Sequence, residues 1–305
     1  VPRPLRPANG AATGSMLAPS AAATLRPEFR WTASTGGYAA ISYEVQLEDG
    51  CTTPGFETCT FLTPVTYAGV TTTRWRPPDE LPVDATPPVG RRYYWRVRAC
   101  DALGTCSGWS RVRYVEIGRV HSDFSGDGYA ALIVGATAMG PWVPDRAVVW
   151  DFYGSAAGFS AASTDNYAVS HTDDARLAAG IIYMGDVDAD GYPDLAVASP
   201  YYYYRTSGVG LVTFGHGGRG SMGTMFPWGG VTYDVTGPDS TDAQLGYSIA
   251  GDADLDGDGF DDLVVGVLEH HGDVADEGAV FAYFGGPERL DHPGRLRLPR
   301  VNEHG

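Results

Sequence analysis

One short pattern occurs three times in the second half of the chain and constrains its fold more than any other feature. Its fullest copy, residues 254–262, reads Asp-Leu-Asp-Gly-Asp-Gly-Phe-Asp-Asp, and a run of small and β-branched apolar residues follows it. Carboxylates occupy alternate positions, a glycine permits a sharp turn, and a last carboxylate follows three residues later. Such a loop wraps a hard cation, because the side chains of positions 1, 3, 5 and 9 and the carbonyl of position 7 converge on one point.

Two earlier segments repeat this pattern at a spacing of roughly 65 residues, which is the length of one small β-unit. Residues 186–194 read Asp-Val-Asp-Ala-Asp-Gly-Tyr-Pro-Asp, and residues 123–131 read Asp-Phe-Ser-Gly-Asp-Gly-Tyr-Ala-Ala. We call residues 123–131 the first loop, 186–194 the second loop and 254–262 the third loop.

The second and third loops carry the full ligand pattern and are predicted to bind calcium. The first loop has Ala131 at position 9 and a serine at position 3, so a cation site and an acidic, solvated turn both remain open for it. The predicted metal ligands are Asp186, Asp188, Asp190, Tyr192 and Asp194; Asp254, Asp256, Asp258, Phe260 and Asp262; and Asp123, Ser125, Asp127 and Tyr129.

An EF-hand is the obvious alternative for such a loop. An EF-hand needs flanking helices and a bidentate glutamate at position 12. Position 12 is instead Val134, Val197 or Val265, each inside a short apolar run that reads as a buried strand. The sequence therefore predicts that the loops join β-strands.

Length and charge exclude several classes of protein. The chain has 305 residues, enough for two domains, and a formal net charge of -16. Ten of its acidic residues stand at the predicted ligand positions of the three loops, so much of this imbalance belongs to the predicted metal sites. Negative charge disfavours nucleic-acid binding. No apolar run approaches the roughly 20 residues that span a bilayer, so no membrane-spanning segment is expected.

The four cysteines form two close pairs, Cys51 with Cys59 and Cys100 with Cys106, without a C-x-x-C motif or a histidine at zinc spacing. Disulfides are the predicted state, and they place the protein in an oxidising, extracellular setting where calcium is plentiful. The chain begins at Val1, so we expect any signal peptide to lie outside it or to have been removed.

The first part of the chain predicts a linker followed by a β-domain. Residues 1–20 are rich in proline, alanine and glycine and are interpreted as a linker or a loose first strand. Residues 21–118 alternate apolar and polar side chains between proline and glycine turns, which predicts a β-sandwich. Trp31 and Trp95 are expected in its core rather than in a ligand platform.

This segment resembles a fibronectin type III domain. The resemblance rests on Arg-Tyr-Tyr-Trp-Arg-Val-Arg-Ala at 92–99, Gly-Trp-Ser at 108–110, a last strand at 112–116, and Trp31 with residues 43–47 as the second and third strands. In that fold the two cysteine pairs lie in turns at opposite ends of the sandwich. The resemblance therefore implies two local bridges, Cys51–Cys59 and Cys100–Cys106.

Residues 119–305 resemble the FG-GAP repeats of the integrin α-subunit N-terminal region. Leu245-Gly246 stands where the family has Phe-Gly, and Ala-Ser-Pro at 198–200 stands where it has Gly-Ala-Pro. A strand with aromatic and glycine residues follows each loop, at 146–154, 208–215 and 278–286. The expected repeats are about 119–170, 171–236 and 237–290, with the start of a further one after them.

The family builds seven-bladed β-propellers, with one four-stranded blade per repeat and calcium in the first hairpin of several blades. The resemblance therefore implies an all-β chain, in which a fibronectin III-like sandwich precedes a partial, three-repeat propeller. Propellers need four to eight blades to close. We expect further blades to come from the rest of a longer chain.

Two functions follow from these features. The first is a secreted or cell-surface adhesion and interaction scaffold, non-catalytic, with structural calcium and an extracellular protein or glycan as ligand. Four consecutive tyrosines, residues 201–204, lie in a loop expected on the face opposite the calcium, where they either bind a ligand or pack on a neighbouring blade. His270 and His271 in a similar loop are expected to be solvated rather than metal-binding or catalytic.

The alternative is an accessory propeller region of an extracellular enzyme that degrades polysaccharides or lipids. No nucleophile elbow occurs, because Ala250 stands where Gly-x-Ser-x-Gly needs its last glycine, and no zinc-binding helix motif is present. Paired aspartates could serve a glycosidase, but their spacing here fits a cation. The scaffold interpretation is therefore favoured.

Overall fold

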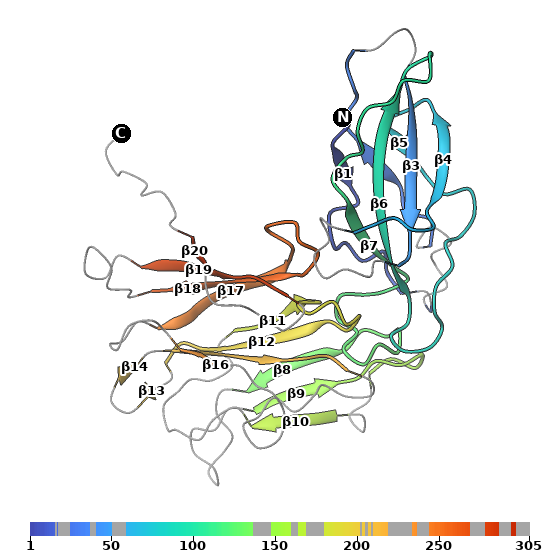
Figure 1. The fold of residues 1–305 in the computed structure, drawn as a ribbon. Coiled ribbons are helices and arrows are strands. Elements are labelled where there is room, and N and C mark those ends of the chain that lie inside the picture. Colours follow the sequence, from blue (N-terminus) through green and yellow to red (C-terminus); the bar gives the residue numbers. More distant parts are fainter. Residues whose placement is uncertain are drawn as a thin grey trace. The chain divides into compact units, whose positions relative to one another are not determined.

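The computed structural model describes residues 1–15, 17, 25–36, 41–50, 59–136, 148–159, 164–168, 180–201, 203–204, 207–208, 210–218, 234–236, 244–268, 278–286 and 294–296. Every regular element in these ranges is a β-strand. The chain divides into two compact units (Figure 1). The first comprises Val1–His121, Gly126–Gly128 and Asp254–Phe260, and the second comprises Ser122–Ser125, Tyr129–Ala253 and Asp261–Gly305.

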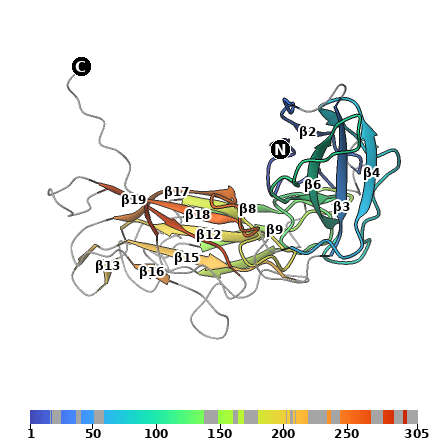
Figure 2. The ribbon, with the colours of Figure 1, turned by 45° about the horizontal axis from the view of Figure 1, so that its top comes forward.

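Strands β1 to β7 form two antiparallel sheets, which we call the two-sheet domain (Figure 2). One sheet has the order β1-β2-β5 and consists of β1 (Pro4–Arg6), β2 (Phe29–Trp31) and β5 (Arg74–Trp75). The other has the order β4-β3-β6-β7 and consists of β4 (Val65–Val70), β3 (Ser42–Glu48), β6 (Arg91–Cys100) and β7 (Arg113–Ile117).

The core of this domain follows from the two-residue period of its strands. On β6, Tyr93, Trp95, Val97 and Ala99 are buried, and they pack with Phe29, Trp31 and residues of β3 and β7 in one apolar cluster. The rings of Phe29 and Trp95 meet edge to face at 4.9 Å. The predicted two-sheet core is confirmed, including both tryptophans, whereas the assignment to fibronectin type III stays a prediction.

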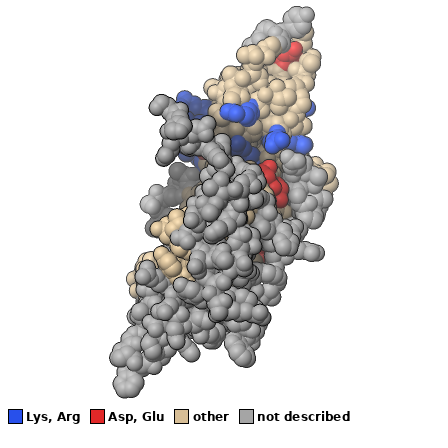
Figure 3. Space-filling view, turned by 90° about the vertical axis from the view of Figure 1, so that its left-hand side faces the viewer, with Lys and Arg blue, Asp and Glu red and all other residues tan. Residues whose placement is uncertain are grey.

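The other face of β6 carries arginines that lie over aromatic rings. The Arg96 guanidinium lies 4.1 Å from the Phe61 ring centre and 4.8 Å from that of Trp109, and Arg98 lies 4.5 Å from Trp109. Arg98 also pairs with Glu44 at 2.7 Å. Arginine side chains gather on the surface of this domain (Figure 3), although the chain as a whole is acidic.

The N-terminal segment contributes to the fold. Pro4 pairs with Trp31, so β1 is an edge strand of the first sheet. Proline is tolerated there because an edge strand need not donate on both sides. The interpretation of residues 1–20 as a linker is therefore wrong for Pro4–Arg6, and the alternative of a first strand is confirmed.

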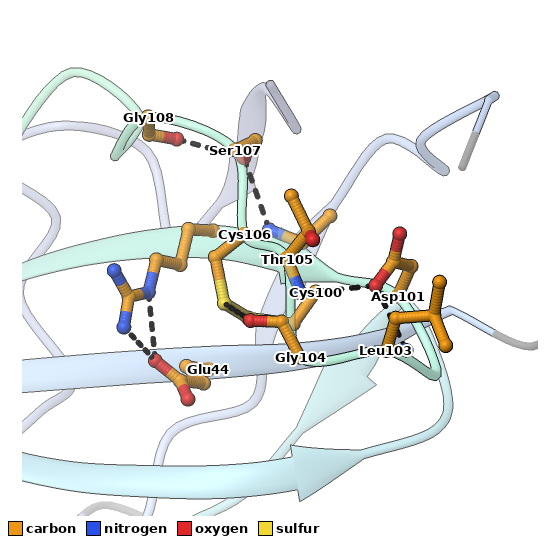
Figure 4. The surroundings of a disulfide bond; sticks show 11 residues. Glu44, Cys100, Asp101, Leu103, Gly104, Thr105, Cys106, Ser107 and Gly108 are labelled. Atoms are coloured by element: carbon orange, nitrogen blue, oxygen red, sulfur yellow. Dashed lines mark hydrogen bonds and ion pairs between the residues drawn. A yellow bond between two sulfur atoms is a disulfide. The ribbon is translucent and has the colours of Figure 1, made fainter. Parts of the chain in front are cut away.

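The second predicted disulfide is present. Cys100 and Cys106 are bonded across a turn in which the Asp101 carboxylate accepts hydrogen bonds from the N–H groups of Leu103 and Thr105 (Figure 4). Cys59 is also disulfide-bonded, and its predicted partner Cys51 lies outside the described residues. Local bridges of this kind rigidify turns more than they build a core.

The remaining strands form the repeat region, which consists of three sheets and a hairpin (Figure 1). The first sheet, ordered β10-β9-β8, contains β8 (Leu132–Ala136), β9 (Val148–Phe152) and β10 (Thr164–Ala168). The second contains β11 (Gly180–Gly185), β12 (Asp194–Ser199), β15 (Leu211–Gly215) and β16 (Asp234–Thr236). The third contains β17 (Leu245–Ala253), β18 (Asp262–Val267), β19 (Ala279–Tyr283) and β20 (Gly294–Leu296), and the hairpin contains β13 (Tyr203–Tyr204) and β14 (Ser207–Gly208).

The second and third sheets are four-stranded antiparallel meanders, as expected of the repeats. Two details differ from the prediction. β20 pairs with β19, so the segment expected to start a further repeat instead supplies the fourth strand of the third sheet. The first loop follows β7 in sequence, and the described part of the first sheet contains no strand ahead of that loop.

The second and third sheets share one apolar core, which includes Met184, Val212 and Phe214 from the second sheet and Leu245, Val265 and Phe281 from the third. Close approach depends on glycine at the interface. A Cβ added to Gly251 would lie 2.9 Å from the Met184 Cα. The sheets are therefore packed too closely for any side chain at position 251.

Candidate metal centres

The three loops follow the same backbone path. Positions 4 and 6 of every loop have a positive φ, which allows the chain to turn twice within nine residues. The φ angles at position 4 are 66° for Gly126, 59° for Ala189 and 85° for Gly257, and those at position 6 are 91° for Gly128, 96° for Gly191 and 99° for Gly259. The loops join strands and not helices, because Val134, Val197 and Val265 lie in β8, β12 and β18.

The second loop directs its carboxylates inward by hydrogen bonds to its own backbone. The Asp186 carboxylate at position 1 accepts from the N–H of Gly191 at 3.0 Å. Asp188 accepts from the N–H of Asp190 at 3.2 Å, and Asp190 accepts from the N–H of Tyr192 at 2.8 Å. Each acid is thus fixed by an N–H further along the loop.

The third loop repeats this pattern position by position. Asp254 accepts from Gly259 N–H at 2.9 Å, Asp256 from Asp258 N–H at 3.1 Å, and Asp258 from Phe260 N–H at 3.1 Å. Two independent stretches of sequence therefore build one geometry, which the alternating aspartates and the glycine at position 6 encode locally.

In the second and third loops, the acid at position 9 is hydrogen-bonded to the segment that directly follows the third strand of the sheet. Asp194 and Asp262 are buried, with exposed fractions of 0% and 1%. Asp194 accepts hydrogen bonds from Gly217 N–H at 3.1 Å and Val187 N–H at 2.9 Å, and Asp262 accepts from Gly285 N–H at 2.9 Å. A carboxylate in this place can bridge a bound cation and the neighbouring strand.

Among the described residues of the loops and strands, three groups of side chains could each hold one ion, because the donor atoms within a group lie within 4.8 Å of one another. The groups are Asp186, Asp188 and Asp190; Asp254, Asp256 and Asp262; and Asp188, Asp194 and His216. The predicted acids of positions 1, 3 and 5 meet in the second loop, and those of positions 1, 3 and 9 meet in the third. Tyr192 and Phe260 are half-buried and buried, and each donates its N–H to the acid at position 5.

The first loop is different. Asp123 and Ser125 are buried, and the Ser125 hydroxyl donates to Asp123 at 3.3 Å. Asp127 and Tyr129 are half-buried. At position 9 the buried Ala131 offers only its backbone, which accepts from the Tyr183 hydroxyl at 2.8 Å. Within the described ranges, no three-donor group comes from this loop.

Crowding of the acids shifts their titration. Burial raises the pKa of Asp254 and of Asp194, although His216 acts in the opposite direction on Asp194. Desolvation within the loop and the charge of Asp188 raise the pKa of Asp190 to about 6. Carboxylates held together in this way repel one another, and a bound cation would remove that repulsion.

A fourth group of donors, Glu44 with Cys100 and Cys106, is not a metal site, because both sulfur atoms belong to the disulfide. The strand pair β13 and β14 contains Tyr203 and Tyr204, and Tyr201 is half-buried. Tyr202, His270 and His271 lie outside the described residues, so the tyrosine surface stays a prediction. None of the described segments forms a helix with the length and apolarity needed to cross a bilayer.

Hydrogen bonds also join neighbouring repeats through their loops. The Asp261 carboxylate at position 8 of the third loop accepts from the Asp186 N–H of the second loop at 2.9 Å. Gly218 N–H donates to the Phe124 carbonyl and Gly286 N–H donates to the Val187 carbonyl, both at 2.9 Å. Both acceptors stand at position 2 of the preceding loop, so the same contact recurs from repeat to repeat.

Sequence reasoning missed Asp261 and His216. Asp261 has no equivalent acid in the other loops, where Ala130 and Pro193 occupy position 8. His216 follows β15, and strand pairing aligns it with Tyr153 and Phe284, because Leu132, Leu195 and Leu263 pair with Phe152, Gly215 and Tyr283. The sequence signal for His216 was that a histidine stands where the other two repeats have the aromatic residues Tyr153 and Phe284.

Comparison with known proteins agrees with this geometry. Residues 180–214 and 245–283 match the FG-GAP repeat family. These segments include the second and third loops, and the expected first repeat at 119–170 lies outside them.

The curated relatives are integrin α-subunits. The chain is 36% identical to chicken (Gallus gallus) integrin alpha-6 over 97 residues, which are 32% of this chain and 8% of that protein. It is 30% identical to mouse (Mus musculus) integrin alpha-7 over 161 residues, 52% and 12% of the two chains, and 32% identical to mouse integrin alpha-IIb over 151 residues, 48% and 14%. The chain thus spans a small part of the length of these relatives. Together with the paired loops, these matches support an integrin-like protein with FG-GAP repeats.

Proposed function

We propose that this chain is a secreted or cell-surface interaction module of the integrin α-like FG-GAP type, with structural calcium in its second and third loops. The observation that carries the proposal is that the two loops share one hydrogen-bond pattern and that, in each, oxygens of three carboxylates lie within 4.8 Å of one another inside the matched repeats. Oxygen ligands on a flexible loop are what calcium prefers.

The residues present fit such an ion. Positions 1, 3 and 5 supply carboxylates from the loop, and the buried acid at position 9 supplies one that is already bonded to the third strand. Calcium would supply two positive charges, which offset the repulsion of these acids. The loop, the first two strands and the third strand would then be fixed together, so the role is structural rather than catalytic.

The finer assignments belong to the same proposal. The two-sheet domain is a fibronectin type III-like module, and residues 122–296 form part of a propeller that further blades complete. The first loop holds at most a weakly bound cation, because it has two carboxylates at ligand positions where the other loops have four. The ligand is an extracellular protein or a glycan, and no reaction is assigned to the chain.

Calcium dependence of stability tests the proposal. The melting temperature of the full chain should rise by about 10 °C in Ca²⁺ at about one hundred times the Kd relative to EDTA, since two filled sites at about 2.7 kcal/mol each add about 5.4 kcal/mol. Asp188→Ala and Asp256→Ala should each remove about half of this rise.

Asp79→Asn is the matched control, because it removes one exposed carboxylate of the two-sheet domain and should leave the full rise. A melting temperature that is equal in Ca²⁺ and EDTA, with the protein folded by circular dichroism, would contradict the structural role.

A further inference from the structure

We propose that the second loop is also a site for a first-row transition-metal dication, which His216 binds together with Asp188 and Asp194. This inference rests on the proposed function to the extent that the second loop is taken to hold a cation. It adds a nitrogen ligand that the aspartate pattern does not contain, and it distinguishes this loop from the third.

The three donor atoms come from three separate elements. Asp188 lies in the loop, Asp194 begins β12, and His216 follows β15. The Nδ1 atom of His216 lies 3.2 Å from an Asp194 oxygen and 3.4 Å from an Asp188 oxygen. One imidazole nitrogen therefore faces two carboxylates at once.

The separations suit a shared metal. The 3.2 Å separation from Asp194 is at the long end of the range for N–H···O hydrogen bonds, so a protonated Nδ1 can donate to this carboxylate when no metal is bound. Two ligand atoms bound to zinc at about 2.0–2.1 Å in tetrahedral geometry lie about 3.3 Å apart. The two separations from His216 Nδ1 are those of neighbouring ligands around such an ion, and the two carboxylate oxygens lie within 4.8 Å of each other.

The backbone fixes the imidazole in this place. Gly217 N–H donates to the same Asp194 oxygen that His216 faces. A Cβ added to Gly217 would lie 2.4 Å from the Pro193 carbonyl oxygen, so the chain approaches the loop as closely as glycine allows. The His216 side chain is 21% exposed as a whole, whereas its Nδ1 atom is buried against the carboxylates. A ligand held this way loses little entropy on binding.

The donor set determines which ions fit. Imidazole binds zinc, cobalt, nickel and copper well, whereas calcium prefers oxygen ligands. The equivalent residues are Tyr153 in the first repeat and Phe284 in the third, neither of which supplies such a nitrogen. Asp188 belongs both to the oxygen group with Asp186 and Asp190 and to the group with His216. Calcium and a transition metal should therefore compete for this carboxylate.

Zinc and cobalt titrations of the full chain after chelation test this site. Zn²⁺ should bind the wild type by calorimetry, and Co²⁺ should give visible d–d absorption. His216→Phe, which installs the residue of the third repeat, should weaken Zn²⁺ binding at least about tenfold and abolish the cobalt spectrum. Its rise in melting temperature with Ca²⁺ should stay that of the wild type.

Further variants guard against misleading outcomes. A His270→Gln/His271→Gln double variant removes two histidines that are adjacent in sequence and outside the proposed site, and it should leave Zn²⁺ binding unchanged. If His216→Phe fails to fold, His216→Asn serves in its place. Equal Zn²⁺ affinity in the wild type and the His216 variant, or no Zn²⁺ binding by the wild type, would overturn the inference. Loss of the calcium response in the wild type with Zn²⁺ binding retained would instead count against the proposed function alone.

Discussion

The two-sheet domain and the repeat region balance their buried charges in different ways. In the two-sheet domain, the buried Glu116 carboxylate pairs with Arg92 and Arg119. Burial raises its pKa, but the two arginine charges and their hydrogen bonds outweigh this effect and lower the pKa below its usual value. In the repeat region, burial raises the pKa of Asp190 and of Asp194, and both accept hydrogen bonds chiefly from backbone N–H groups.

In the two-sheet domain, the positive charges that balance buried Glu116 come from the chain's own arginines. In the repeat region, we expect them to come from dissolved cations. An arginine neutralises a buried acid under all conditions, whereas the acids of a loop are neutralised only when a dissolved cation binds to them. The stability of the two-sheet domain should therefore be independent of dissolved cations, and that of the repeats should follow them.

The largest effect should come from the core of the two-sheet domain. Trp95 is fully buried against Phe29, so Trp95→Ala should cost about 3–5 kcal/mol in the free energy of unfolding. Urea denaturation followed by near-ultraviolet circular dichroism measures this cost. The calcium-induced rise in the melting of the repeats should persist in the variant, and its disappearance would show that the two regions are not independent.

A matched pair of carboxylate-to-amide changes should give the sharpest contrast. Glu116→Gln leaves two arginines near a neutral amide and should cost about 2–4 kcal/mol, with or without Ca²⁺. Asp262→Asn keeps an acceptor for Gly285 N–H and removes one of the crowded charges, so in EDTA it should change stability by less than about 1 kcal/mol. In Ca²⁺ it should lose the stabilisation of the third loop.

Urea midpoints of both variants, each in Ca²⁺ and in EDTA, provide the four measurements needed. If the two variants lost the same free energy of unfolding in EDTA, relative to the wild type, the distinction between acids neutralised by arginines and acids neutralised by dissolved cations would be contradicted.

The smallest effect should come from the backbone of the second loop. Ala189 has a φ of 59°, where an alanine is strained by about 1–2 kcal/mol, and glycine occupies this position in the other two loops. Ala189→Gly should therefore stabilise the chain by about 0.5–1 kcal/mol after the greater flexibility of unfolded glycine is taken into account. Thermal denaturation in EDTA measures it, and a lower melting temperature would mean that the Ala189 methyl group makes contacts that outweigh the strain.

Much of the fold could be predicted from local patterns. Alternation of apolar and polar side chains in residues 21–118 predicted strands with Trp31 and Trp95 in the core, and the spacing of Asp, Gly and apolar residues placed the second and third loops between strands. These patterns suffice because side-chain period and turn chemistry act over a few residues.

The features that were missed depend on contacts distant in sequence. His216 meets Asp194 only because β15 pairs with β12, and Asp261 meets Asp186 only because two repeats lie side by side. For β1 the sequence left a linker and a loose first strand open, because a proline-rich segment gives no alternation and gains its structure from its partner β2. The strand register, which no local pattern contains, decides these contacts.

The contact from Gly218 to Phe124, repeated from Gly286 to Val187, gives the repeat array a polarity. The first and second loops each accept a backbone hydrogen bond from the repeat that comes next in the chain. During synthesis, the loop of each repeat would therefore lack this hydrogen bond until the next repeat has been made and has folded. Truncation from the C-terminal side should consequently loosen the acidic loop of the last intact repeat first, because that loop loses the backbone hydrogen bond from its successor. Loops nearer the N-terminus should keep this hydrogen bond.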